Sequence, residues 1–503
     1  DRLGIGTELK KAARRQRVAD PDAVVGRILA MVVNRALEPS SKHAIPEWLT
    51  GDVFVDGTPD EVYDEQLYRA MDFLLSVGET VQQAVFFATA DLLNLEVDLL
   101  LYDTTSVYFE MENDDVERAE RAARWDAFDA GEGPEPTRPR PQVVNDPPVR
   151  LHGHSRDHRP DLAQVVVGLA VTREGIPVRC WVWPGNTNDA ETVAEVKASL
   201  AGWRLNRVVW AVDRGMTSEA NLRMLQRGGA HYIAGEKMRA GKPAVEEALS
   251  RPGRYQRVAD GLEVKEVVVG EGEARRRYVV VRNLAQMARD REERELKVKR
   301  IEDAIARLPD GGEEHTKAVC ALRAHPSLGR YVTLDRRGRP ALDRAKLKAE
   351  ERLDGKYLVI TSDDSLSSAD VALGYKQLAE VERAWRSLKT DLDLRPMYHR
   401  KTDRIHAHVL LCWLALLLVR TVEVGCGETW PRVRQEMDRL HRGVFEGPHG
   451  RFAQVTEMTP RQHQLLKALQ VAPPQRFQAI EPVLPGIEDG SPLDETPPTD
   501  PVP

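Results

Sequence analysis

The chain has 503 residues, of which 42% are hydrophobic and 30% are charged, and its formal net charge is -7 at pH 7. This length exceeds a typical single domain of about 100–200 residues, so we expect several parts with a large core. The net charge excludes a chain that is basic as a whole, as a dedicated duplex-binding module usually is. Any contact with DNA must therefore use local basic patches.

The cysteines and the apolar segments of the sequence argue against a secreted, zinc-binding or membrane-spanning protein. The four cysteines lack metal-ligand spacing, which argues against a disulfide framework or a zinc site and fits a reducing cytoplasm. The first residues, DRLGIGTELKKAARRQR, contain no apolar signal core, and the missing Met indicates a trimmed start. The longest apolar stretch, Val409 to Val419, is below the roughly 20 residues that cross a bilayer. We therefore expect a buried core helix and no membrane partner.

Residues 1–90 show helical spacing nearly throughout, as in AVVGRILAMVVNRAL, and predict a small helical module. Its basic run KKAARRQR could contact phosphates, although a solvated charged face explains the run about equally well. The next segment, Val97 to Glu110, is rich in strand formers, so Asp103 is placed at the end of a strand. A charged helix follows, and the Pro-rich residues 131–148 are expected to be disordered or extended, without an assigned role.

Strand patterns then recur over Leu162–Thr172, Ile176–Gly185 and Arg207–Gly215, followed by a helix and the strand AHYIAG. Two hairpin-like strands and a strand–helix–strand unit describe a mixed α/β sheet. Asp213 falls at the end of its strand, as Asp103 does. Residues 236–355 change character to a β-rich part and a charged helix, so we interpret them as an inserted subdomain that does not continue the sheet.

The predicted division of the chain has six parts. They are a helical N-terminal DNA-binding module (1–90), a first part of the catalytic core (91–235), the insertion (236–355), a second part of the core (356–425), a helical C-terminal region (426–472) and a disordered, acidic, Pro-rich tail (473–503).

The segment YKQLAEVERAWRSLK predicts a helix that carries an acid on the same line as two other polar residues. Positions seven apart drift little at 3.6 residues per turn, so Tyr375, Glu382 and Lys389 align, with Arg386 beside them. Charges on helices usually form surface salt-bridge ladders, so these residues alone favour that interpretation over a functional site. Glu380 points about 200° away and is expected to be solvated.

Asp103, Asp213 and Glu382 share a context that suggests a metal site. Strand ends of an α/β sheet gather ligands, and three converging carboxylates repel each other unless divalent cations relieve the repulsion. Oxygen-only ligands suit Mg²⁺ or Mn²⁺, and two such ions can drive an in-line phosphoryl displacement. Basic residues near Glu382 form a locally positive strip suited to a phosphodiester backbone: Arg383, Arg386, Lys389, Arg395, Arg400, Lys401 and Arg404.

The chain resembles DDE-type insertion-sequence transposases with an RNase H-like catalytic core, in the group with the signature Tyr-x2-Arg-x3-Glu-x6-Lys. Tyr375, Glu382 and Lys389 match this register, while Leu378 replaces the family's Arg. The blocks YDTTSVYFE, HGHSRDHRPDLAQVVVGL, WPGNTND, VVWAVDRGM, HYIAG and LKTDLDLRPMYHR are also similar and occur in the family's order, over about residues 97–410.

The resemblance implies an RNase H-like mixed sheet flanked by helices and interrupted by a β-rich insertion. It implies that Asp103, Asp213 and Glu382 are catalytic metal ligands for Mg²⁺, with Mn²⁺ as a substitute. It further implies cutting and joining of double-stranded DNA at transposon ends by a homodimer in a bacterial cytoplasm, associated with the nucleoid when bound to DNA. The expected DNA contacts are Tyr375, Arg383, Arg386, Lys389, Arg156 and Arg214. Arg383 or Arg386 could replace the missing Arg.

Other interpretations remain open at this point. A domesticated relative could bind DNA without cutting it, and a metal-dependent nuclease on the same fold could cleave without preference for particular ends. The histidines of HGHSRDHRPD lack further ligands for a metal site, so their loop is expected to line the DNA path, with Asp157 and Asp161 as caps or salt-bridge partners. Four tryptophans, at positions 181, 183, 210 and 385, are expected in the core rather than stacked on bases.

Overall fold

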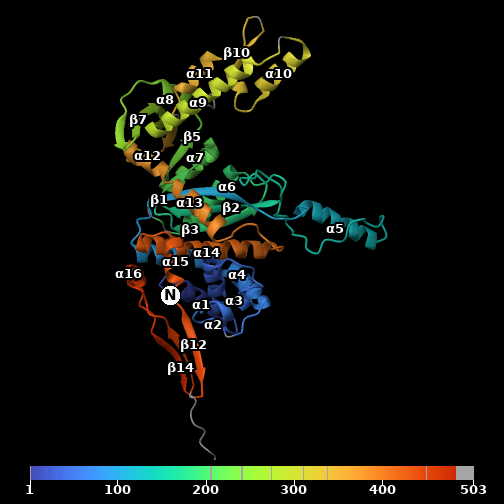
Figure 1. Cartoon of the computed structure of the whole chain (residues 1–503), viewed down its shortest axis with the longest axis vertical. Coiled ribbons are helices and arrows are strands. Elements are labelled where there is room, and N and C mark those ends of the chain that lie inside the picture. The colour runs from blue at the N-terminus through green and yellow to red at the C-terminus, as the bar shows by residue number, and fades with distance from the viewer. Residues whose placement is uncertain are drawn as a thin grey trace, which may run out of the picture.

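A computed structural model of the chain describes residues 2–482 except 60, 204, 206, 239–241, 273–274, 310, 337 and 449. The N-terminal region is helical, as predicted. Its helices are α1 (Ile5–Arg15), α2 (Pro21–Leu37), α3 (Ile45–Gly51) and α4 (Asp64–Leu93). Asp20 caps α2 by accepting from the Ala23 N–H, and Pro21 occupies the first turn, where a missing N–H is harmless. These helices form the layer below α14 (Thr402–Cys426) in Figure 1.

A mixed nine-stranded sheet forms the centre, in the order β3-β2-β1-β4-β5-β11-β8-β7-β6. Its first five strands are β1 (Leu99–Tyr108), β2 (Gln164–Thr172), β3 (Pro177–Pro184), β4 (Val209–Val212) and β5 (His231–Glu236). β1, β2 and β3 are antiparallel neighbours, whereas β4 and β5 run parallel to β1. This order and these directions are those of the expected RNase H-like core, so the predicted fold class is confirmed.

The insertion extends this sheet, which corrects the prediction that it would break away from it. β11 (Lys356–Thr361) pairs with β5 on one side and with β8 (Arg276–Asn283) on the other, and β7 (Leu262–Val269) and β6 (Gln256–Ala259) follow outward. The unpaired edge of β5 offers backbone groups that an added strand satisfies, a non-local pairing that no local pattern encodes.

The remainder of the insertion rises above the sheet in Figure 1. It contains α9 (Leu284–Ala306), α10 (Gly312–Ala324), α11 (Arg344–Glu351) and the small pair of β9 (Val332–Leu334) and β10 (Pro340–Leu342). These elements pack around a separate cluster that includes Ile301 and Tyr331. A further helix of the insertion, α8 (Pro243–Ser250), packs on β7.

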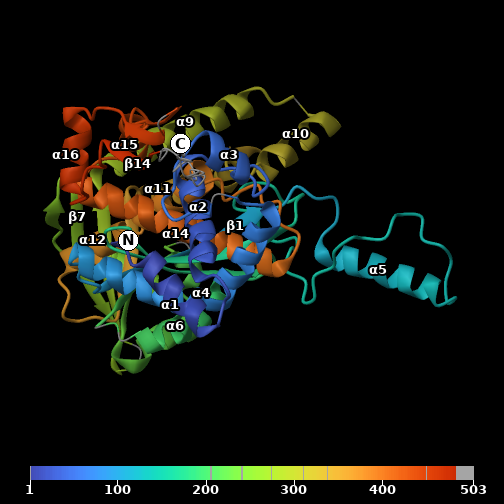
Figure 2. The same ribbon diagram turned by 90° about the horizontal axis from the view of Figure 1, so that it is seen from below.

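Between β1 and β2 the chain makes a projecting arm, visible on the right of Figures 1 and 2. The arm contains α5 (Asp115–Asp129), whose first turn Asp114 caps through the Glu117 N–H, and a return through the Pro-rich residues 131–148. The return folds back on the helix, because Trp125 donates its indole N–H to the carbonyl of Arg138 at 2.9 Å.

The C-terminal region is less helical than predicted. α15 (Trp430–Met437) and α16 (Pro460–Ala468) flank a hairpin of β12 (Arg442–Gly447) and β13 (Gly450–Val455), and β14 (Phe477–Pro482) adds a third strand. The tail expected to be disordered from residue 473 therefore contributes one strand, because β13 offers a free edge for pairing. Residues 483–503 of that prediction lie outside the described residues.

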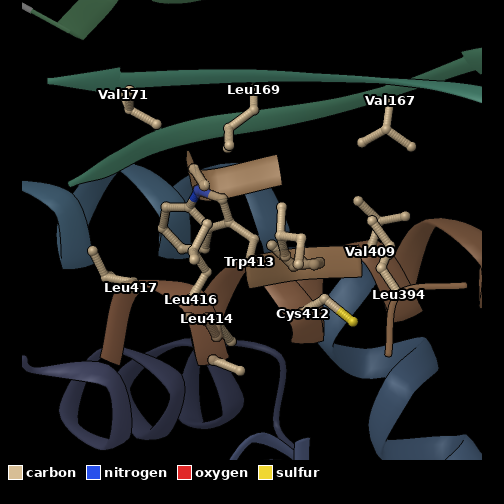
Figure 3. Close-up of a cluster of buried hydrophobic side chains, with 14 of the residues drawn as sticks. Val167, Leu169, Val171, Leu394, Val409, Cys412, Trp413, Leu414, Leu416 and Leu417 are labelled. Atoms are coloured by element: carbon tan, nitrogen blue, oxygen red, sulfur yellow. The ribbon is translucent and has the colours of Figure 1, made fainter. Parts of the chain in front are cut away.

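The buried helix α14 joins the two layers. Val167, Leu169 and Val171 alternate along β2 and therefore share a face, and Figure 3 shows them directed at Trp413 and its neighbours on α14. By length and composition α14 is the one helix in the described part of the chain that could cross a membrane, yet 67% of its most apolar window is buried in the protein. The predictions of a core helix and of four core tryptophans are confirmed.

Candidate active site

Strand register brings Asp103 and Asp213 together. β1 and β4 are parallel, with Leu99 opposite Val209 and Tyr102 opposite Val212, so the two aspartates are the next residues on neighbouring strands. Their backbones are about one inter-strand spacing apart, roughly 5 Å. Asp103 lies in the middle of β1 rather than at its end as predicted, because β1 continues along β2 as far as Tyr108 after β4 has ended.

Asp103 is a half-buried acid whose partners do not offset the cost of its charge. Its nearest cation is Arg156, whose Nη1 lies 3.7 Å from Oδ1, and its side chain is 23% exposed. Burial raises the pKa of Asp103 to about 6 despite the opposing effect of Arg156, and the neighbouring Asp213 and Asp189 add to the rise. An ionised Asp103 is therefore costly in this structure.

Asp189, at the first position of α6 (Asp189–Leu200), is an additional acid of the site that the residue patterns did not single out. It accepts a hydrogen bond from Thr104 Oγ1 at 2.6 Å and forms an ion pair with Arg156. Asp189 thereby holds Arg156 next to Asp103. The block WPGNTND contains this acid, so the signal was present but carried no assigned role.

The predicted Glu382 helix is interrupted. α12 (Ser368–Lys376) and α13 (Ala379–Arg386) are separated by a tightened turn in which the Leu378 N–H donates to the Tyr375 carbonyl, and a π-helical turn, Ser387–Asp391, follows. Tyr375, Glu382 and Lys389 therefore do not lie along one regular helix, which corrects the alignment expected from 3.6 residues per turn. Leu378, at the tightened turn, has a buried side chain that packs in the core.

All three predicted metal ligands line one pocket of about 430 Å³ between β1, β4 and α13. Its other lining residues are Arg214, Gly235, Glu236, Leu262, Asn283, Tyr357, Leu358, Tyr375, Lys376, Leu378, Ala379 and Val381. Among the described residues, no three carboxylate, imidazole or thiolate side chains stand close enough to enclose an ion. The carboxylates thus face a common space without forming a closed cluster.

A second pocket of about 610 Å³ continues from the first one and shares Arg214, Glu236, Asn283 and Tyr357 with it. The side chains that belong only to this pocket are Lys237, Met238, Gln286 and Lys356, together with Gly355. Two lysines among them give this extension of the site a basic wall.

Tyr375 and Lys389 both contact acids of the protein. The Tyr375 hydroxyl donates to Asp213 Oδ1 at 3.2 Å. Lys389 Nζ donates to Asp157 Oδ1 at 2.8 Å, and Arg395 Nη1 lies 2.5 Å from the same oxygen. The prediction that Asp157 is a salt-bridge partner is confirmed, as is that for Asp161, which pairs with Arg159.

The remaining arginines predicted to contact DNA differ in whether an acid of the protein already pairs with them. Arg214 is 66% exposed beside the pocket, and its Nε lies 3.9 Å from Asp213 Oδ1. Arg383 is paired with Glu380 at 3.0 Å. Arg386 is exposed, and the described residues give its side chain no ion pair.

Glu380 is not solvated as predicted. Its carboxylate lies 3.3 Å from the buried Arg420 as well as contacting Arg383, and its side chain is 21% exposed. The expectation that it points away from Glu382 agrees with these contacts, because Arg420 lies on α14 and not at the pocket. Glu380 therefore ties α13 to the core helix.

An RNase H-like sheet with one aspartate on a strand, a second directly after the neighbouring parallel strand and a glutamate on a later helix defines the class of DDE enzymes. The sequence matches the family described as the Transposase DDE domain over residues 148–418, more than half of the chain. The chain belongs to this family, which acts in DNA transposition and generally uses divalent metal ions. Asp213 and Glu382 lie inside the matched range, and Asp103 precedes it.

Solved structures that resemble the chain at a distance include a piggyBac transposase in a synaptic complex with hairpin DNA. Its TM-score is 0.39, with 8% identity over 90% of this chain and 70% of that one. A similarity at this level carries no inference about mechanism. No curated protein sequence matches the chain.

Proposed function

We propose that the chain cuts and joins phosphodiesters at the ends of a DNA transposon, with two divalent cations held by Asp103, Asp213 and Glu382. The register of β1 and β4, which sets two aspartates from distant segments side by side in a pocket that Glu382 also lines, carries this proposal. The ligands offer only oxygen donors of like charge, and this donor set fits Mg²⁺, with Mn²⁺ as a substitute.

When bound, such ions activate an attacking oxygen and stabilise the leaving oxygen of an in-line displacement. The residues of the chain prepare the site for them. Arg156 lowers the cost of ionising Asp103, and Asp189 keeps Arg156 in place.

The DNA strand is proposed to approach along the exposed cations. Arg214 beside the pocket and Arg386 on α13 would contact phosphates, while the paired Arg383 would contribute mainly to the local positive field. Lys389 and Arg156 now pair with Asp157 and Asp189. They would contact the same DNA strand if a phosphate replaced these carboxylates as their partner. The helical residues 1–90 would help to recognise the ends, and a homodimer would hold two ends together.

Cleavage of labelled end-containing duplex in Mg²⁺ tests this proposal. Wild type should nick at the end, while Asp213→Ala and Glu382→Ala should bind the same DNA without cutting it. Asp391→Asn is the matched control, because this exposed acid follows α13 and lines neither pocket. It should cut like wild type.

Three outcomes would contradict the proposal, and two of them would favour an alternative function. Equal cleavage by wild type and both alanine variants would end the assignment of the three carboxylates. Binding without cleavage by wild type, across several candidate ends, would favour a domesticated relative. Cleavage of unrelated duplexes at the same rate would favour a nuclease without preference for ends.

A further inference from the structure

The Asp213 carboxylate has one hydrogen-bond partner among the described side chains, and that partner is Tyr375. The phenol donates to Oδ1 at 3.2 Å, while Oδ2 has no hydrogen-bond partner within the described residues. Arg214 Nε, at 3.9 Å from Oδ1, is beyond hydrogen-bond distance. Because the Asp213 side chain is 51% exposed, packing alone does not hold its rotamer. The Tyr375 hydroxyl is therefore the group that orients this carboxylate.

The position of Tyr375 is in turn set by Gly235 on β5. Val212 pairs with Ala234, so Gly235 lies opposite Asp213 on the neighbouring parallel strand. A Cβ atom built on Gly235 would lie 2.1 Å from the Tyr375 hydroxyl oxygen and 2.8 Å from Cζ. Since real Cβ atoms essentially never approach so closely, the absence of a side chain at residue 235 is what lets the phenol pass over β5 to Asp213.

The ring of Tyr375 is also fixed from its other side. It packs on Tyr357 of β11 with ring centroids 5.8 Å apart and an interplanar angle of 34°. A side chain confined in this way has its polar atom directed at the carboxylate and not at solvent.

We infer that Tyr375 is a positioning residue that fixes the Asp213 carboxylate for cation binding, with Gly235 as the space that permits it, and not a contact to the DNA end. The inference rests on the proposed role of Asp213 as a metal ligand. An outer-shell hydrogen bond to a ligand fixes its orientation, and its loss typically lowers metal affinity about 10- to 100-fold.

The test compares Mn²⁺ binding to the DNA-free protein, followed by electron paramagnetic resonance, with binding of end duplex in EDTA. Tyr375→Phe keeps the ring and removes the hydroxyl. It should weaken Mn²⁺ binding about 10-fold or more, while metal-free DNA binding stays within about 2-fold of wild type. Gly235→Ala should weaken Mn²⁺ binding in the same direction, because the added methyl group displaces the phenol.

Tyr278→Phe serves as the matched control. Tyr278 is a buried tyrosine on β8 that lines neither pocket, and its hydroxyl makes no hydrogen bond within the described residues. This variant should bind Mn²⁺ like wild type.

Wild-type Mn²⁺ affinity in Tyr375→Phe overturns the inference, and a selective loss of DNA binding would make Tyr375 a DNA contact instead. A parallel loss of both activities also overturns it, because Tyr375 would then act on the fold. If Asp213→Ala binds Mn²⁺ as tightly as wild type, it is the proposed function that fails.

Discussion

Two aspartates differ in how completely they are paired: the fully buried Asp115 at the root of the arm and the half-buried Asp103 in the carboxylate pocket. At the root, the Asp115 carboxylate accepts from Asn145 Nδ2 at 2.9 Å, from the backbone N–H groups of Val149 and Arg150 at 3.1 and 2.9 Å, and from the Arg150 guanidinium at 2.6 and 2.9 Å. In the pocket, Asp103 has one cation at 3.7 Å and two acids nearby.

The pKa values follow this difference. Burial alone would raise the pKa of Asp115, but the hydrogen bonds from Arg150 and Asn145 outweigh it and the pKa is lowered. Burial raises the pKa of Asp103 to about 6, because Arg156 compensates only in part. A buried acid with all its partners stabilises the fold, whereas a buried acid without them stores electrostatic energy that a ligand can release.

The largest expected effect is a loss of DNA cleavage without a loss of stability when an acid of the pocket is replaced. Asp213→Asn and Glu382→Gln should lower end cleavage by on the order of 10³-fold or more, because a lost ligand removes several kcal/mol of transition-state stabilisation. The same variants should unfold at wild-type denaturant concentrations, since both side chains lie at the pocket surface and not in the core. Cleavage assays and urea unfolding measure the two effects, and a large loss of stability would contradict the distinction.

At the root of the arm, replacing the acid should instead lower the stability of the fold. Asp115→Asn should lower the free energy of unfolding by about 3–5 kcal/mol, because Arg150 remains buried without its counter-charge. Urea denaturation measures the loss. Glu120→Gln on the same arm is the control, because its exposed pair with Arg124 at 3.7 Å should be worth less than about 1 kcal/mol. Equal stability of the two variants would show that the arm root is not a structural ion pair.

The stabilisation that Asp115 provides should decrease as the pH falls. Because the folded-state pKa of Asp115 is lowered, its stabilising contribution is present above the unfolded-state pKa of about 3.9 and is lost as the pH falls through the folded value. The difference in unfolding free energy between wild type and Asp115→Asn should therefore be constant near pH 7 and shrink below about pH 4. A difference that grows towards acid pH would contradict the assigned pairing.

Neutralising the pocket acid should stabilise the protein. Asp103→Asn removes an under-compensated buried charge and should raise the free energy of unfolding by about 1–2 kcal/mol in the absence of divalent ions. Cleavage should be lost in the same variant. Thermal unfolding in EDTA measures the gain, and a destabilised Asp103→Asn would mean that the pocket acid is as well paired as the root acid.

The smallest effect concerns the exposed cation beside the pocket. Arg214→Ala should weaken DNA binding modestly and reduce the slope of log affinity against log salt by about 1, because one phosphate contact is lost. Binding measured at several salt concentrations gives the slope. An unchanged slope would remove Arg214 from the DNA path.

The sequence predicted the parts of this site that depend on local patterns. The strand containing Asp213, the helical segment of Glu382 and the buried helix α14 could all be placed from periodicity and strand-forming residues. The resemblance then supplied the grouping of the three acids, and the register of β1 and β4 supports it for Asp103 and Asp213.

The missed features depend on contacts between distant segments. The anchoring of Asp115 by Arg150 and the pairing of β11 with both β5 and β8 arise from tertiary contacts. Periodicity gives the angle of a residue on an ideal helix, but it does not reveal the tightened turn between α12 and α13. Likewise, the close approach of Tyr375 to Gly235 joins segments about 140 residues apart and leaves no local signature.

Anomalous diffraction from crystals of the protein bound to end DNA and soaked in Mn²⁺ tests the central claim most directly. We predict anomalous peaks between the carboxylates of Asp103 and Asp213, with Glu382 moved towards them. Ordered DNA at the pocket without any Mn²⁺ peak at these carboxylates would contradict the assignment of the three acids as the metal ligands of this transposase.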